Sequence, residues 1–324
     1  MFKTILKFLI PILFLVGLLI IWHNRWWFYD QDRLYGYKPP TEISQIASED
    51  QLTNYSRTLL YVYHPSLENR ETFNSNCNVT TAAIVLGCTV IDRGIYLYNI
   101  QDPALNGVEQ VTAAYEMLHV AYSRLSSSEL KTVNALVIST YNKLAPNDPQ
   151  LRAEYASYLK TEGPGAIDNE MHSTLGTEIG NLPPALNNYY KKYFKDRQVI
   201  VNYADQYESV FTTRQNQVTS DDSQLATLKT QISALNTELT NEYASIEGQQ
   251  ANMDSLKANG DYSQYNSDIG PYNTLVYQYN YQIGQDQTLV NQYNSLVAAR
   301  NSIAISENKL SDEINSLSAT SPAN

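Results

Sequence analysis

The sequence predicts an α+β fold that is mostly helical, with an N-terminal transmembrane helix and a C-terminal antiparallel coiled-coil hairpin. Three observations lead to this prediction: an apolar run near the start, short β-branched runs followed by helical patterns in the middle, and heptad spacing over the last third. We expect an anchor at residues 1–29, a globular domain at 30–200 and the hairpin at 201–324.

The first part is predicted to cross a membrane as a helix. No charged residue interrupts the segment Phe8–Trp22, and apolar residues continue back past Lys7. A spanning helix needs about 20 residues, and a lysine at its end can extend its ammonium group to the interface. A cleaved signal peptide is the alternative, but bulky aromatic residues stand where its small-residue cleavage site is expected. Such aromatic residues suit the lipid interface; they are Trp26, Trp27, Phe28 and Tyr29.

The charges beside this segment predict where the rest of the chain lies. Lys3 and Lys7 precede it, and Arg25 follows it. Because the positive-inside rule weighs lysine and arginine, the N-terminus is expected in the cytoplasm and the body of this single-pass protein outside it. In that environment the only two cysteines, Cys77 and Cys88, are expected to form a disulfide. Two buried thiols are the alternative, and their spacing matches none of the usual zinc patterns.

The middle part is predicted to hold a few strands and a majority of helices. Residues 50–63 carry apolar residues at helical spacing and end in a β-favouring run, Leu60–Tyr63. Residues 82–100 hold two β-branched and aromatic runs separated by "DRG", which predicts a β-hairpin. Helices are expected after Asn106-Gly107, after the serines that precede Glu129, and from residue 148 to the glycines near 163.

The last third carries heptads. A loop is expected at residues 260–271, where "GDYSQYNSDIGP" contains helix breakers, and the same register resumes after it. Two arms with one breaker between them predict an antiparallel hairpin, whereas a partly disordered polar tail is the alternative. The seam of the first arm is expected at Phe211, Val218, Leu225, Ile232, Leu239, Ile246 and Met253. Polar residues that weaken the seam are expected at Glu242, Gln249, Gln282, Asp286 and Arg300.

The charge of the chain limits its partners. The 33 acidic and 22 basic residues give a formal charge of −11. Nucleic acids and anionic lipids are polyanions that such a chain repels, so no nucleic-acid partner is expected. The predicted partners are the membrane, through the N-terminal helix, and a protein or a second copy of the chain, through the coiled coil.

One helix carries a pattern with chemical meaning. In "VTAAYEMLHVAYSRL" Tyr115, Glu116 and His119 occupy the three places of a His-Glu-x-x-His motif. In that motif two ligands one turn apart bind zinc, the glutamate activates a water, and a third ligand comes from elsewhere. The downstream segment "DNEMHSTLGTEIGNLP" offers Glu170, His172 and Glu178; on a continuous helix Glu170 and Glu178 would share a face.

These segments resemble a known family. "LGC", "IYLYN", "VTAAYEMLHVAYSRL", "NEMHSTLGTE" and "YYKKYFKDR" resemble poorly characterised, membrane-anchored bacterial proteins whose helix commonly reads His-Glu-Met-Leu-His and is similar to a zincin active site. The resemblance covers residues 86–197 and implies a zincin-like domain.

The resemblance implies roles for particular residues. Glu116 would be the catalytic general base and His119 a zinc ligand, with Glu178 or Glu170 as the third ligand. His172 would be a further ligand or a partner for the transition state. Tyr115 departs from the pattern, because a phenol with a pKa near 10 is a poor zinc ligand at neutral pH.

Two functions follow from this pattern. In the first, the domain is a degenerate metallopeptidase-like pseudoenzyme, and the hairpin is a scaffold or binding arm at the cell envelope. In that case Tyr115 fills the space of the missing ligand and its hydroxyl bonds Glu170 or Glu178. In the second, the domain is an active zinc peptidase that acts on envelope proteins or peptides. The alternative for His119 is a hydrogen-bonded core histidine, and for the glutamates it is solvent-facing or capping carboxylates. We favour the first function.

Overall fold

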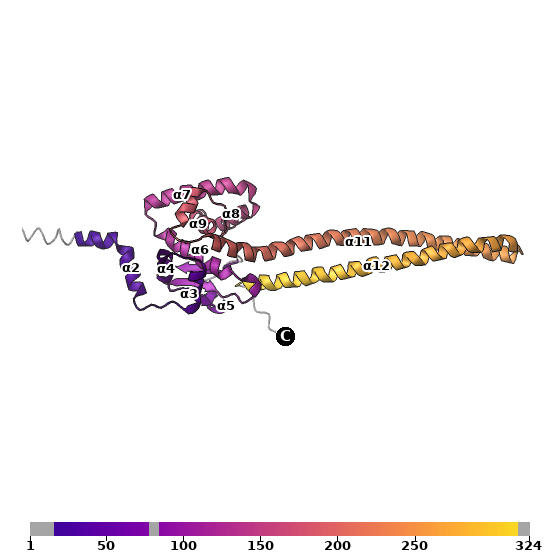
Figure 1. Cartoon of the computed structure of the whole chain (residues 1–324), viewed down its shortest axis with the longest axis horizontal. Helices are drawn as coiled ribbons and strands as arrows, with labels where there is room; N and C mark the ends of the chain where they lie inside the picture. Colours follow the sequence, from indigo (N-terminus) through magenta and orange to yellow (C-terminus); the bar gives the residue numbers. More distant parts are fainter. Residues whose placement is uncertain (1–15, 78–83, 317–324) are drawn as a thin grey trace, which may run out of the picture. The chain divides into compact units, whose positions relative to one another are not determined.

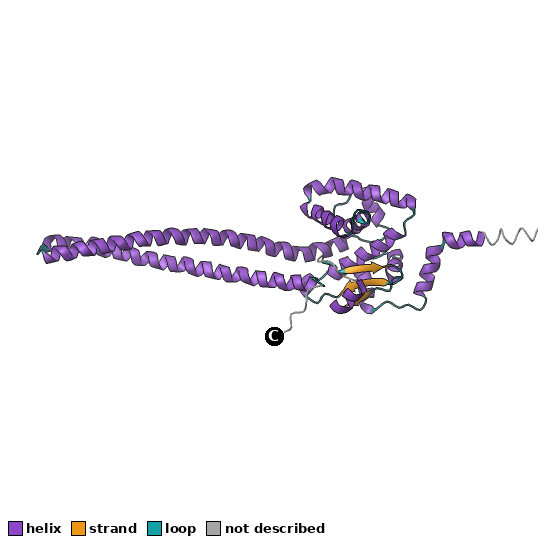
Figure 2. Cartoon of the chain, turned by 180° about the vertical axis from the view of Figure 1, so that it is seen from behind, coloured by secondary structure: helices purple, strands orange, loops and turns teal. Residues whose placement is uncertain are grey.

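The computed structural model describes residues 16–77 and 84–316. It divides into two compact units: unit 1 is Met1–Val210 with Leu310–Asn324, and unit 2 is Phe211–Lys309. Helices dominate, and unit 1 also contains a small sheet, so the mostly helical α+β class is confirmed (Figures 1 and 2).

The sheet of unit 1 has three strands, β1 (Ser66–Glu68), β2 (Gly87–Val90) and β3 (Gly94–Tyr98), in the order β1-β3-β2. β2 and β3 are antiparallel, and β1 runs parallel to β3. The predicted hairpin is therefore confirmed, with Asp92 in its turn at a φ of 61°. Its first strand is joined to the preceding helix by the Cys77–Cys88 disulfide, which confirms the predicted pairing.

Helices surround this sheet and form most of unit 1. Their sequence signals are those expected: Ser126 and Glu129 form a capping box at the start of α7, and Gly107, at a φ of 102°, precedes α6. Gly163, at a φ of 78°, follows α8. Short 3-10 turns occur at Pro103–Leu105 and Ala145–Asn147. The helices are α2 (Arg25–Leu34), α3 (Thr41–Glu49), α4 (Asn54–Tyr61), α5 (Arg70–Cys77), α6 (Val108–Ser123), α7 (Ser127–Leu144), α8 (Pro149–Thr161), α9 (Ile167–Thr177) and α10 (Pro184–Tyr190).

The β-favouring run Leu60–Tyr63 is not a strand. Leu60 and Tyr61 end α4, and the next two residues form a turn. Thr53 caps the helix by accepting a hydrogen bond from the Ser56 amide at 3.2 Å. Leu59 and Leu60 are both fully buried. Helical spacing of these buried residues, together with the cap, outweighs the local β preference because packing overrides propensity.

The centre of unit 1 is α6, which packs against α9 on one side and β2 on another. Two glycines permit this close packing. A Cβ at Gly176 of α9 would lie 2.4 Å from Leu118 Cδ1, and one at Gly87 of β2 would lie 2.5 Å from Thr112 Cγ2. At both glycines the α6 side chains therefore occupy the space that a Cβ would take.

Most of the predicted membrane anchor lies outside the described residues, which begin at residue 16. Residues 16–23 are helical and lead into α2. Among the described residues, no helix combines the length and the hydropathy that crossing a membrane requires.

Unit 2 is built from two long helices, α11 (Gln198–Ala258) and α12 (Tyr262–Ile314), whose outer parts belong to this unit. They run antiparallel, because Arg300 pairs with Asp222 and Gln282 donates to Glu242 at 2.9 Å. The predicted seam lies between them: Ile246 and Met253 are buried, and the other five predicted positions of the first arm are partly buried.

The loop predicted at residues 260–271 is much shorter in the structure. Only residues 259–261 separate the helices, with Gly260 at a φ of 78°, and Pro271 lies inside α12. Asn252 donates to Asp268 at 3.4 Å, so the helices already pair before Pro271. Pairing of the two arms therefore outweighs the one backbone hydrogen bond that a proline removes.

Replacing Gly176 by alanine tests the packing of α6 against α9. We expect the Gly176→Ala variant to lose about 1–3 kcal/mol of unfolding free energy, because its methyl group would overlap Leu118 and Tyr190. Denaturant unfolding followed by circular dichroism measures the change. The control is Gly248→Ala, at a helical glycine with open space around it, which we expect to gain up to about 1 kcal/mol. Equal midpoints for the Gly176→Ala variant and the wild type would contradict the close packing.

Candidate functional site

Two helices bring the first three site residues together. Tyr115 and His119 lie one turn apart on α6, and Glu170 lies in the first turn of α9. The Tyr115 hydroxyl donates to Glu170 Oε2 at 2.6 Å, and His119 Nε2 lies 3.6 Å from the same oxygen. The rings of Tyr115 and His119 are in edge contact at 4.8 Å. We call these three residues the Tyr-His-Glu cluster.

Glu116 points toward β2. Its Oε2 accepts a hydrogen bond from Thr89 Oγ1 at 2.8 Å, and the residue is 6% exposed. Burial raises the pKa of Glu116, while His119 and the Thr89 hydrogen bond act in the opposite direction. A carboxyl group with a raised pKa beside an imidazole suits general base chemistry, and it equally suits a buried structural carboxyl.

His172 is fully buried among tyrosines. Its Nε2 lies 2.9 Å from the Tyr189 hydroxyl, which in turn contacts the Tyr193 hydroxyl at 3.0 Å. Burial, with a contribution from His119, lowers the pKa of His172 to about 3, so the imidazole is neutral. Nδ1 has no hydrogen-bond partner among the described residues. His172 therefore belongs to a chain of tyrosines, and its hydrogen bond does not go to Glu170.

Glu178 lies outside the Tyr-His-Glu cluster. α9 ends at Thr177, and Glu178 caps its C-terminus. It lines a pocket of about 560 Å³ whose wall also includes Glu154 and Glu208. Burial and these two carboxyls raise the pKa of Glu178 well above its ordinary value. Of the two candidates for the third ligand, only Glu170 lies in the Tyr-His-Glu cluster.

The cluster does not fit a catalytic zinc ion. Such a site has three protein ligands and a water, but here His119 and Glu170 supply two. The third place belongs to Tyr115, whose pKa is raised well above 10 by burial and by its neighbours Tyr158 and Glu170. A protonated phenol is a donor and offers zinc no charged ligand. In the described part of the chain, no three His, Cys, Asp or Glu side chains are grouped to hold a metal.

Comparison with models of known protein families, with curated proteins and with solved structures finds no match. The interpretation of the cluster therefore rests on its own geometry and on the motif.

Four residues that contribute to this region carry no signal in the sequence. Thr89 reaches Glu116 from a strand 27 positions away, and Tyr158 of α8 adjoins Tyr115. Glu154 and Glu208 meet Glu178 from α8 and α11, which are far apart in the chain. No local motif could identify them, because only the tertiary fold brings them together.

The pocket beside Glu178 predicts a dependence of stability on pH. Burial raises the pKa of Glu154 to about 7, and the pKa of Glu178 is also raised. A carboxyl with a raised pKa stabilises the fold fully below its ordinary pKa, and this contribution is lost as the pH rises through the folded value. We therefore expect the stability contributed by these carboxyls to fall between pH 5 and pH 7.5, so that the melting temperature of the wild type falls by about 2–4 °C relative to that of a variant without the Glu178 carboxyl.

The matched variants are Glu178→Gln in the pocket and Glu162→Gln at the exposed end of α8. Scanning calorimetry at several pH values should show this relative fall against Glu178→Gln and the same pH dependence for the wild type and Glu162→Gln. Identical pH dependences of the wild type and Glu178→Gln would contradict the raised pKa of Glu178.

Proposed function

We propose that unit 1 is a zincin-like pseudoenzyme domain of a membrane-anchored, extracytoplasmic protein, and that the hairpin is its interaction arm at the cell envelope. The observation that carries this proposal is the hydrogen bond from Tyr115 to Glu170 at 2.6 Å. It joins the replaced ligand position to the remaining carboxylate ligand. The spacing of Tyr115, Glu116 and His119 on α6 supports the zincin-like part.

The hydrogen bond from Tyr115 supplies the Glu170 carboxylate with a partner in the absence of a metal ion. A metal at this place would have to displace the tyrosine hydroxyl from Glu170 Oε2 and remove the proton of a phenol whose pKa is raised. Glu170 is 15% exposed and His119 is 13% exposed, so little water compensates the carboxylate if the bond breaks. Tyr115 therefore satisfies Glu170 in the way that a metal does in an active site.

The location outside the cytoplasm has separate support. Cys77 and Cys88 form a disulfide, and disulfides persist in oxidising compartments. The uncharged run from Phe8 to Trp22 supports an anchor in the membrane.

Restoring the histidine tests the proposal. We expect full-length wild type to bind no stoichiometric zinc and the Tyr115→His variant to bind about one zinc per chain, because two imidazoles and Glu170 then complete the set of three ligands. Mass spectrometry of the purified chain after mild dialysis measures the metal. The control is the double variant Tyr115→His with His119→Ala, which should lose the metal again.

Two other outcomes of the zinc measurement would change the proposal. About one zinc per chain in the wild type, lost on His119→Ala, would overturn the pseudoenzyme proposal and favour an active zinc peptidase on envelope proteins or peptides. If neither the wild type nor the Tyr115→His variant bound zinc, the resemblance to a zincin would be limited to the α6 helix.

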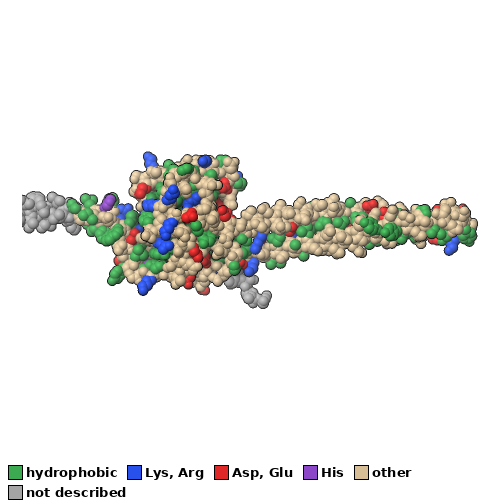
Figure 3. Space-filling model, viewed as in Figure 1, with side chains coloured by type: hydrophobic (Ala, Val, Ile, Leu, Met, Phe, Trp, Pro, Cys, Tyr) green, Lys and Arg blue, Asp and Glu red, His purple; other side chains and the backbone are tan. Residues whose placement is uncertain are grey.

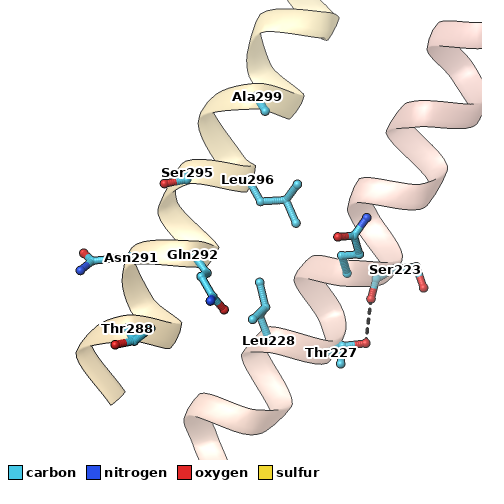
Figure 4. Close-up of a pocket in the computed structure, with 10 residues that line it drawn as sticks. Ser223, Thr227, Leu228, Thr288, Asn291, Gln292, Ser295, Leu296 and Ala299 are labelled. Atoms are coloured by element: carbon cyan, nitrogen blue, oxygen red, sulfur yellow. Dashed lines mark hydrogen bonds between the residues drawn. The ribbon is translucent and has the colours of Figure 1, made fainter. Parts of the chain in front are cut away.

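The hairpin offers a surface for the interaction role. A groove of about 860 Å³ opens between α11 and α12 in unit 2, and Leu228 and Leu296 project into it from opposite helices (Figure 4). None of the ten described residues that line it is charged. On the α12 side, residues 262–299 carry only two charges, Asp268 and Asp286. A groove lined by uncharged residues does not repel a copy of itself, so we propose that two hairpins associate here.

Adding charge to the groove tests this association. We expect the full chain, purified in a mild non-ionic detergent, to have at least twice the 36.7 kDa chain mass by light scattering. Ser295→Glu places a carboxylate in the groove and should give a monomer, because apposed like charges repel. Asn294→Glu, an exposed neighbour outside the groove, is the control and should stay associated. A monomeric wild type, or equal loss in both variants, would remove this role from the groove.

A further inference from the structure

The helix α2 is fixed to the rest of unit 1 along one of its faces. Arg124, just after α6, pairs with Asp30, with Nη2 to Oδ1 at 2.8 Å and Nη1 to Oδ2 at 3.0 Å. The Arg124 guanidinium also lies 4.8 Å from the ring centre of Trp26 and 5.8 Å from that of Tyr29. The Arg124 side chain is 4% exposed. One hydrogen bond and one close ion contact, both largely buried, restrict the orientation of α2 at this point.

A second set of contacts lies one turn further along α2. Arg33 donates through Nε to the Val62 carbonyl at 2.9 Å and through Nη2 to the Arg93 carbonyl at 3.1 Å. The Arg33 carbonyl lies 2.7 Å from His64 Nε2. Just beyond α2, Tyr37 stacks on the His64 ring at 4.1 Å. Together with the Arg124–Asp30 pair, these contacts fix α2 at its middle and at its C-terminal end; we call them the α2 clamp.

The opposite face of α2 is exposed and aromatic. Trp27 is 58% exposed and Phe28 is 44% exposed, while Trp22, just before the helix, is 67% exposed. The helical residues that precede Trp22 expose apolar side chains on all sides, with values from 45% to 63% for Val16, Leu18, Leu19, Ile20 and Ile21. Figure 3 shows these hydrophobic side chains gathered at the amino-terminal end of the described chain.

Lipid is the occupant that fits this surface. A helix that is apolar on every side is buried in a core or in a membrane, and no described residue covers this one. Tryptophan concentrates where the hydrocarbon meets the headgroups. Arg25 lies between two indoles, 5.6 Å from the Trp22 ring and 5.3 Å from the Trp26 ring. Such a cation can reach the phosphate level while its neighbours stay in the apolar layer.

We propose that the outer face of α2, with Trp22, Trp27 and Phe28, lies in the headgroup region of a phospholipid bilayer, and that the α2 clamp holds unit 1 rigidly on the membrane surface. The proposal rests on the membrane attachment proposed above. It also divides the four interfacial aromatic residues expected from the sequence into two pairs. Trp26 and Tyr29 face the protein, whereas Trp27 and Phe28 face lipid.

The chain allows a direct test, because it contains only three tryptophans. Three full-length proteins each keep one of Trp22, Trp26 and Trp27 and carry phenylalanine at the other two positions. Each is reconstituted in phosphatidylcholine vesicles with or without bromine on the upper acyl chain, since bromine quenches tryptophan only at short range. We expect several-fold stronger quenching of Trp22 and Trp27 than of Trp26.

A fourth protein keeps Trp26 alone and carries Arg124→Ala. Loss of the ion pair should release α2, so quenching of Trp26 should rise toward that of Trp27, while circular dichroism shows whether the fold is retained. If this variant does not fold, Asp30→Asn removes the same pair from the other side.

The outcomes separate this proposal from the one on which it rests. If no tryptophan is quenched, the membrane attachment itself is wrong. If Trp22 is quenched but Trp27 is not, the anchor stands and the headgroup position of α2 is wrong. Equal quenching of Trp26 and Trp27 in the presence of Arg124 would show that the clamp does not hold α2 against unit 1.

Discussion

The close packing of α6 between α9 and β2 is the constraint on which the rest of unit 1 depends. Gly176 and Gly87 lack the Cβ atoms that would separate these elements from α6. As a consequence, a residue from the first turn of α9 reaches the face of α6 that carries Tyr115 and His119. The same packing buries Glu116 against Thr89. The Tyr-His-Glu cluster exists because α6 and α9 pack closely enough for Glu170 to reach Tyr115 and His119.

Burial then determines the charge state of this region. The pKa of Tyr115 is raised and that of His172 is lowered, so both side chains are neutral at pH 7. Neutral groups that donate and accept hydrogen bonds stabilise a core, whereas a hydrolytic zinc site needs three ligands with free lone pairs and a bound water. Tyr115 therefore favours internal hydrogen bonding in this cluster over the binding of a metal.

Local signals in the sequence predicted much of the fold. The Ser126 capping box and the hairpin turn at Asp92 act through neighbouring residues, and each appears in the structure as expected. The heptads predicted the seam of unit 2 because a seven-residue period directly specifies the face of a helix. The predicted extent of the loop near Pro271 was wrong. The destabilisation by one proline is local, whereas the pairing of two long helices extends along both of them.

The site was predicted less completely than the fold. Spacing placed Tyr115, Glu116 and His119 correctly on one helix, but it could not choose between Glu170 and Glu178. That choice depends on where α9 ends and on which elements adjoin each of its ends. Likewise, nothing in "RWWFYDQD" shows that Trp26 faces Arg124 while Trp27 faces outward, because Arg124 is 98 positions away from Trp26.

X-ray absorption at the zinc edge, on wild type incubated with excess zinc and then desalted, tests the central claim most directly. The spectrum reports the atoms bound to the metal, so it identifies the ligands as well as the amount. We expect too little retained zinc to give a histidine-containing shell in the wild type. A shell of imidazole nitrogen with carboxylate and phenolate oxygen, lost on replacing His119 or Tyr115, would contradict the claim that Tyr115 holds Glu170 in a metal-free site.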